Sequence, residues 1–147
     1  LSGSAVNSGV GFAIPIDILK RVLPSLIEDG THEYPYLGIT SLSAQSWNLK
    51  VLEQLDLPSD ATGAYVTCVQ PDGPADEAGI IGAGPCTASS LLPGGDLIIA
   101  IDDAPVEEFN DLLAYLITET NVGDTITMHV LRDGTEVEIP LTLEARP

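Results

Sequence analysis

Short apolar runs separated by turn residues follow one another through most of the chain. Five of them have the length and composition of β-strands: residues 37–42, 64–69, 97–101, 125–131 and 136–143. The run 97–101 is apolar throughout, which is typical of a strand buried on both faces. Asp133 and Gly134 separate the last two runs and predict a two-residue hairpin, because glycine tolerates the positive φ that such turns require. The pattern therefore predicts a mainly β fold.

Near the start of the chain, a strand-like run, Val10–Ile14, leads into a predicted helix. Asp17 is expected to be the N-cap, since its carboxylate can accept from free amides of the first turn. Gly30 is the expected C-terminal stop. Pro24 removes one backbone hydrogen bond within the helix and predicts a kink. Apolar residues recur at helical spacing between these ends: Leu19, Val22, Leu23, Leu26 and Ile27.

Two further helices are predicted between the strands. Residues 74–78 form a short turn closed by Gly79, and residues 107–120 form a longer amphipathic helix. One apolar stripe of the longer helix, expected to face the core, consists of Phe109, Leu112 and Leu116. A second, adjacent stripe consists of Leu113 and Ile117. We expect this second stripe to line a groove, although either residue taken alone is compatible with ordinary core.

Residues 82–94 are rich in Gly, Ala, Pro and Ser and have the composition of an inserted loop. Trp47 lies in the stretch 44–57 and is expected to be a partly buried anchor for an extra helical turn. No apolar run approaches the length of about 18 residues that a membrane span needs.

The charge is strongly one-sided, with a formal net charge of −17 from 22 acidic and five basic residues. Such a surface repels phosphate backbones and anionic headgroups, which argues against nucleic-acid and membrane binding. A well-solvated surface is the simpler interpretation, and a preference for neutral or basic ligands is the alternative. With 44% hydrophobic residues, the chain has enough apolar side chains to form a core.

The chain offers no clear metal site. Cys68 and Cys86 are widely separated and have no neighbouring histidine, so they do not indicate zinc. They are compatible with a disulfide in an oxidising compartment and equally with two buried thiols. An acid-rich patch lacks the alternating spacing and central glycine of a calcium loop, and a solvated helix start explains it better. This patch consists of Asp102, Asp103, Glu107, Glu108 and Asp111.

Four motifs occur in a definite order along the chain. A Gly-Val-Gly-Phe-Ala-Ile-Pro stretch with its helix spans residues 9–30, and Tyr36-Leu37-Gly38-Ile39 follows it. Next come Pro74-Ala75 with Ala78-Gly79-Ile80, and then Gly95-Asp96-Leu97-Ile98 with Ile101-Asp102. In this order they resemble the end of the protease domain and the following PDZ domain of the HtrA/Deg family of trypsin-like serine proteases.

The resemblance implies a PDZ-like, partly open β-sandwich or barrel, mainly β with two or three helices and capped by a long and a short helix. Residues 1–30 would be a strand and helix remnant of a chymotrypsin-like protease domain, 31–35 a linker and 36–147 the PDZ domain. The intact protein would be a serine endopeptidase of an extracytoplasmic or cell-envelope compartment. No cofactor is implied.

Three departures from the family pattern change what is expected. Residues 82–94 intervene before Gly95-Asp96, and the basic residue common just ahead of the carboxylate-binding loop is missing, His32 being the nearest candidate. No Gly-Asn-Ser-Gly-Gly-Pro nucleophile motif occurs, and no Ser-His-Asp triad can be placed around His32 or His129. The chain alone is therefore not expected to cleave peptide bonds.

By resemblance, the groove would bind an extended peptide as an added β-strand. Amides of Leu37, Gly38 and Ile39 would hold the terminal carboxylate, since Gly38 has no Cβ to obstruct the turn. Burial of one aliphatic side chain and a few ladder hydrogen bonds predict affinity of about micromolar order. The predicted peptide-binding residues are Tyr36, Leu37, Gly38, Ile39, Thr40, Leu42, Asn110, Leu113 and Ile117.

Two functions of different kinds follow from these expectations. The first is a regulatory module that recognises C-termini or extended segments of unfolded or partner proteins. The second is a structural domain that packs against the protease or other subunits and binds no free peptide. Residues 1–14, deprived of protease partners, are expected to dock on a neighbouring molecule or fold back, which allows self-association.

Overall fold

A computed structural model describes residues 16–88 and 90–147 of the chain. The chain divides into two compact units, Leu1–His32 and Glu33–Pro147. The division falls inside the expected linker 31–35, although Pro35 already belongs to the first strand. The expected strand at Val10–Ile14 and the expected docking of residues 1–14 lie outside the described residues.

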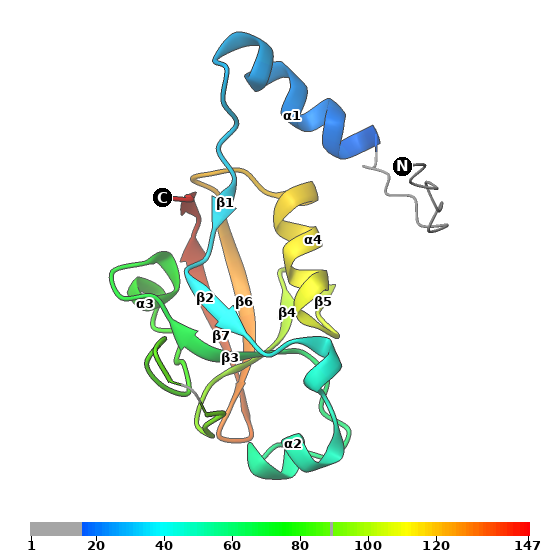
Figure 1. Cartoon of the computed structure of the whole chain (residues 1–147), viewed down its shortest axis with the longest axis vertical. Coiled ribbons are helices and arrows are strands. Elements are labelled where there is room, and N and C mark those ends of the chain that lie inside the picture. The colour runs from blue at the N-terminus through cyan, green and yellow to red at the C-terminus, as the bar shows by residue number, and fades with distance from the viewer. Residues whose placement is uncertain (1–15, 89) are drawn as a thin grey trace, which may run out of the picture. The chain divides into compact units, whose positions relative to one another are not determined.

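The described part of the first unit is dominated by one helix, α1 (Ile16–Glu28), which contains Pro24 (Figure 1). Asp17 was expected to be the N-cap but lies within the first helical turn, where a carboxylate still favours the positive end of the helix dipole. Gly30 follows the helix with a φ of +75°. Several apolar side chains of the helix remain exposed: Ile16, Leu19, Leu23, Leu26 and Ile27.

The second unit is an antiparallel β structure (Figure 1). Its main sheet follows the order β2-β3-β4-β6-β7, with β5 paired to β4, and a separate two-stranded sheet joins β1 to β8. The strands are β1 (Pro35–Tyr36), β2 (Ile39–Ser41), β3 (Ala64–Val69), β4 (Leu97–Ile101), β5 (Ala104–Pro105), β6 (Thr125–Arg132), β7 (Thr135–Thr142) and β8 (Glu144–Ala145). Among the residues that the structure describes, strand β2 pairs only with β3 and so ends the main sheet.

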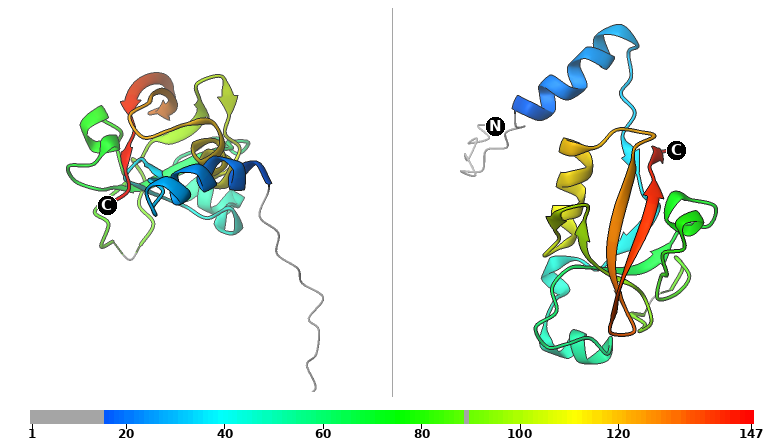
Figure 2. Two further views of the ribbon diagram at one scale, coloured as in Figure 1. Left: turned by 90° about the horizontal axis from the view of Figure 1, so that it is seen from above. Right: turned by 180° about the vertical axis from the view of Figure 1, so that it is seen from behind.

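Two helices lie on opposite sides of the strands of the second unit, as the views from the front and from behind agree (Figures 1 and 2). The short helix α3 (Pro74–Ala78) is closed by Gly79, whose φ of +83° is the left-handed conformation expected there. The long helix α4 (Phe109–Glu119) begins with a capping box formed by Glu108 and Asp111. A further helix, α2 (Leu49–Gln54), follows the 3₁₀ turn η1 (Ala44–Ser46).

The apolar runs supply the core as predicted. Ala64, Val66 and Ile98 have no solvent-exposed surface and pack with Leu112 of α4. A smaller cluster forms around Tyr65 and Leu97, and Trp47 packs on it while its indole N–H donates to the Ala61 carbonyl at 3.0 Å. The expected role of Trp47 as a partly buried anchor is thus confirmed.

The predicted hairpin joins β6 to β7, with Asp133 at a φ of 50° and Gly134 at 75° between paired residues Arg132 and Thr135. Asp102, which the sequence grouped with a solvated helix start, lies instead in the turn between β4 and β5 and has a structural role. Asp102 accepts from the Thr127 amide at 2.7 Å and from the Tyr115 hydroxyl at 2.9 Å. The hydrogen bond to Asp102 raises the pKa of Tyr115 above its ordinary value.

The loop 82–94 is attached to the domain by several polar contacts and one covalent bond. The Tyr65 hydroxyl donates to the Leu92 carbonyl at 2.8 Å and accepts from the Gly95 amide at 3.0 Å. Cys68 of β3 and Cys86 form a disulfide, with their Cα atoms 5.1 Å apart. Of the two alternatives that the sequence left open, the structure therefore contains the disulfide and not two free thiols. Within the described residues, no helix is long and apolar enough to cross a membrane.

Candidate functional site

A groove of about 490 Å³ lies beside β2 and α4 (Figure 1 shows the two elements). One wall comes from the segment Tyr34–Ile39 and the other from α4, and Arg146 closes part of the rim. The α4 wall consists of Phe109, Leu113, Leu116 and Ile117. The groove is therefore mainly apolar and bordered by backbone, which suits an extended chain with an apolar side chain.

Along the edge of β2 that faces away from β3, backbone N–H and C=O groups are available to pair with a further strand. Hydrogen bonds from the Gln70 amide to the Gly38 carbonyl (2.7 Å) and from the Leu42 amide to the Tyr65 carbonyl (3.1 Å) bracket the β2–β3 pair. With this register, Thr40 directs its backbone toward β3, while Ile39 and Ser41 direct theirs to the outer edge. No other strand among the described residues pairs with that edge.

The segment Leu37–Gly38 turns its carbonyls into the domain. The Leu37 carbonyl accepts from the Ala75 amide at 2.9 Å, and the Gly38 carbonyl accepts from the Gln70 amide. Among the described residues, no hydrogen bond uses the amides of Leu37 or Gly38. With the outward amide of Ile39, the segment offers three successive donors beside the groove, a pattern suited to an anion.

Gly38 makes this turn possible. Its φ of +79° lies in the left-handed region, which a residue with a side chain adopts only with strain. Space is not the constraint, because a Cβ at this position would meet its nearest atom, Cε1 of Tyr36, at 3.5 Å.

Six of the nine sequence-predicted site residues line the groove: Tyr36, Leu37, Gly38, Ile39, Leu113 and Ile117. Their placement agrees with the second α4 stripe, which the helical spacing had separated from the core stripe. Leu112 is fully buried, whereas Leu113 is 39% exposed. The Tyr36 backbone does not join the donor set, because Tyr36 lies opposite Glu144 in the β1–β8 ladder.

Thr40, Leu42 and Asn110 do not line the groove. Side chains alternate along a strand, so Thr40 and Leu42 lie on the opposite face of β2 from Ile39, and Leu42 packs there against the cluster around Tyr65. Asn110 is exposed and donates to a Glu108 carboxylate oxygen at 3.2 Å. Their side chains are therefore not part of the groove lining, and the expected places of Thr40 and Asn110 near the groove mouth and of Leu42 on the peptide-pairing strand stay predictions.

Sequence reasoning missed five lining residues: Tyr34, Pro35, Phe109, Leu116 and Arg146. Phe109 and Leu116 were assigned to the core, and both also pack against it. Arg146 reaches the groove through the short β1–β8 pairing, which no local pattern reveals. It is the only charged residue among those that line the groove.

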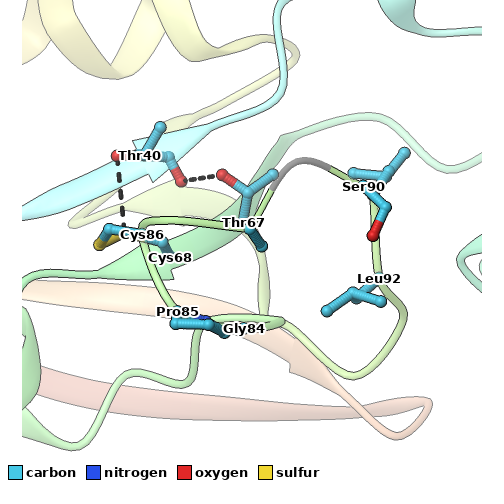
Figure 3. A pocket seen from close by; sticks show the side chains of 10 residues that line it. Thr40, Thr67, Cys68, Gly84, Pro85, Cys86, Ser90 and Leu92 are labelled. Atoms are coloured by element: carbon cyan, nitrogen blue, oxygen red, sulfur yellow. Dashed lines mark hydrogen bonds between the residues drawn. A yellow bond between two sulfur atoms is a disulfide. The ribbon is translucent and has the colours of Figure 1, made fainter.

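Thr40 instead borders a second, smaller hollow of about 250 Å³ beside the disulfide (Figure 3). Its carbonyl accepts from the Thr67 hydroxyl at 2.9 Å, and its hydroxyl lies 3.7 Å from the Cys68 sulfur. Gly84, Pro85 and Leu92 of the loop complete much of its wall. This hollow has no charged side chain and no ordered set of donors comparable to the Leu37–Ile39 segment.

The described residues contain one serine–histidine contact, between Ser25 Oγ and His32 Nδ1 at 2.7 Å. Ser25 also donates to the Val22 carbonyl at 2.9 Å, so its hydroxyl proton is committed to the helix backbone. A nucleophile needs that proton directed to the imidazole, so this pair does not form the start of a triad. No group of three or more potential metal ligands occurs in residues 16–88 and 90–147.

Comparison with known proteins agrees with this geometry. The family model described as "PDZ domain" matches residues 35–143. Protease Do-like 1, chloroplastic, of Arabidopsis thaliana is 34% identical over 146 residues, covering 99% of this chain and 31% of the relative. A probable periplasmic DegP-like serine endoprotease of Rickettsia conorii is 32% identical and is covered over 24% of its length.

Among solved structures, the HtrA-type protease AlgW with a decapeptide superposes with a TM-score of 0.73 at 30% identity, covering all of this chain and 40% of AlgW. The chain thus spans well under half of these relatives. Fold, groove and comparisons together show that the chain belongs to the PDZ domain family, as found in HtrA/DegP-type serine proteases.

Proposed function

We propose that this chain binds peptides in the groove between β2 and α4 and serves as the peptide-recognition module of an HtrA-type serine endopeptidase. It recognises C-termini or extended segments of unfolded or partner proteins and thereby regulates proteolysis. The observation that carries the proposal is the β2 edge, unpaired within residues 16–88 and 90–147, which continues into the Leu37 and Gly38 amides that no described group accepts from. A relative solved with a decapeptide supports it.

The peptide adds to the sheet as an extra strand, and β2 is the strand with which it pairs. Ile39 and Ser41 supply the outward amides and carbonyls for the ladder. The terminal carboxylate lies at the Leu37–Ile39 amides, and the last side chain enters between Ile39 and Ile117. Ladder bonds give affinity that is independent of sequence, and the apolar pocket selects the side chain.

Binding of modest strength follows from these terms. One buried aliphatic side chain contributes about 1.5–3 kcal/mol, and each ladder hydrogen bond contributes about 1 kcal/mol net. Ordering of the peptide and loss of its free motion offset much of the sum. A dissociation constant of about micromolar order results.

The same proposal extends to the rest of the chain and to its location. Relatives match 93–99% of this chain, beyond the PDZ match at residues 35–143. This supports residues 1–30 as the last part of a protease domain, whose core the exposed apolar face of α1 would contact. The periplasmic relative favours an extracytoplasmic location, whereas the other relative is chloroplastic; a disulfide suits an oxidising compartment such as the periplasm.

A peptide with a free C-terminal carboxylate, compared with its C-terminally amidated twin, tests the proposal. Isothermal titration of the full chain with decapeptides ending in Leu, Val, Phe or Ala is expected to give micromolar binding of at least one acid. The matching amide should bind at least tenfold more weakly, because it has no charge for the three amides to hold. Absence of binding by every peptide would favour the alternative, a structural domain that packs against the protease.

A further inference from the structure

One basic side chain lies at the groove although the surrounding domain is highly acidic. Arg146 follows directly after β8, and its amide donates to the Tyr34 carbonyl at 3.1 Å, continuing the β1–β8 ladder. This hydrogen bond holds the backbone of Arg146 beside Tyr34, the residue before β1, and β1 in turn precedes Leu37. The side chain consequently lines the same groove as Leu37 and Gly38.

The other two basic residues of the second unit are placed elsewhere. Arg132 is engaged by Asp96 through Nε at 2.8 Å and Nη2 at 2.7 Å, and it also donates to the Gly79 carbonyl. Lys50 is an exposed residue of α2 and does not line the groove. Within the described residues, Arg146 makes no ion pair, and the other residues that line the groove contribute apolar side chains, tyrosines and backbone.

The positive charge of Arg146 lies in a strongly negative protein, which matters for an anionic ligand. A protein of net charge −17 repels any anionic ligand, including the carboxylate at the end of a peptide. The groove lining carries no acidic side chain, so its one charge is positive. Arg146 is therefore the one charged side chain of the described groove lining, and its charge is opposite in sign to the net charge of the molecule.

We infer that the Arg146 guanidinium is the counter-ion of the peptide's terminal carboxylate, an inference that rests on the proposed function. The amides of Leu37, Gly38 and Ile39 donate to the carboxylate, and Arg146 supplies the full positive charge that neutral amides lack. Guanidinium presents paired N–H donors that match a carboxylate, which makes arginine better suited to this role than lysine. Arg146 thereby selects chain ends over internal segments.

The test uses the full chain, the acid and amide forms of the tightest-binding decapeptide, and the variant Arg146→Gln. Arg146→Gln is expected to weaken binding of the acid about tenfold and to leave binding of the amide within about twofold. It should also flatten the salt dependence of acid binding, since one exposed charge interaction is lost. Arg146→Lys should restore part of the affinity, because it returns the charge without the paired donors.

Lys50→Gln is the matched control, since it removes one positive charge from the same unit away from the groove. It should leave the affinity for both peptides unchanged, and thermal unfolding of each variant should match that of the parent chain. If Arg146→Gln binds the acid as tightly as the parent while the acid still binds better than the amide, Arg146 is not the counter-ion and peptide recognition stands. If the parent chain binds no peptide, both the inference and the proposed function fail.

Discussion

Leu113 shows how one exposed apolar residue can be assigned to a ligand surface rather than to the core. Its neighbour Leu112 is completely buried, whereas Leu113 keeps 39% of its surface exposed while lining the groove. An exposed leucine gains little from folding, so its contribution comes when a ligand covers it.

Leu113→Ala is therefore expected to weaken peptide binding about five- to tenfold, from the loss of roughly 1–1.5 kcal/mol of apolar burial in the complex. The free energy of unfolding should change little, because the side chain is substantially exposed in the free chain. Titration calorimetry and urea unfolding measure the two effects separately.

Thr118→Ala provides the control on the same helix, since Thr118 is exposed and does not line the groove. Its affinity for peptide should equal that of the parent chain. Equal weakening by both substitutions would show that α4 acts through its stability and not through Leu113.

At the scale of elements, one buried ion pair joins strands that are distant in the sequence. Asp96, which is 1% exposed, stands just before β4, accepts from Arg132 at the end of β6 and accepts from the Ile81 amide at 2.8 Å. The Gly95-Asp96 motif that the family resemblance singled out thus has a structural role: it fixes the segment after α3 to the β4–β6 ladder.

Asp96→Asn is expected to lower the free energy of unfolding by about 3 kcal/mol, because it leaves the Arg132 charge without its partner in a partly buried place. Denaturant unfolding followed by tryptophan fluorescence measures this change through Trp47. Asp133→Asn, the same substitution at an exposed turn position, should stay within about 0.5 kcal/mol of the parent. A loss below 1 kcal/mol for Asp96→Asn would contradict the assigned role.

Elements governed by local pattern were predictable from the sequence. The short apolar runs between turn residues predicted the long strands, Asp133-Gly134 predicted the hairpin, and the second stripe of α4 predicted Leu113 and Ile117 at the groove. Features that depend on long-range pairing were not. The β1–β8 pairing that carries Arg146 to the groove joins two-residue strands, too short to show a period. Alternation along β2, by contrast, is a local pattern and already places the Thr40 and Leu42 side chains on the face opposite Ile39.

For the second unit as a whole, sheet order determines where a ligand strand can be added. The sheet runs from β2 to β7, and β2 keeps one edge unpaired among the described residues. An exposed edge promotes unwanted association unless it is short or otherwise guarded. Strand β2 has only three residues, Ile39–Ser41, and lies beside α4 in a protein of high net charge, which limits pairing with other copies.

Strand addition at the β2 edge is tested most directly by native-state amide hydrogen exchange. The exchange is measured on the full chain with and without saturating free-acid decapeptide. The amides of Thr40 and Leu42, directed to β3, should be protected in both states, whereas those of Ile39 and Ser41 should become protected only when peptide is bound. Protection of Ile39 and Ser41 already in the free chain, or no change in them at saturation, would contradict strand addition at β2.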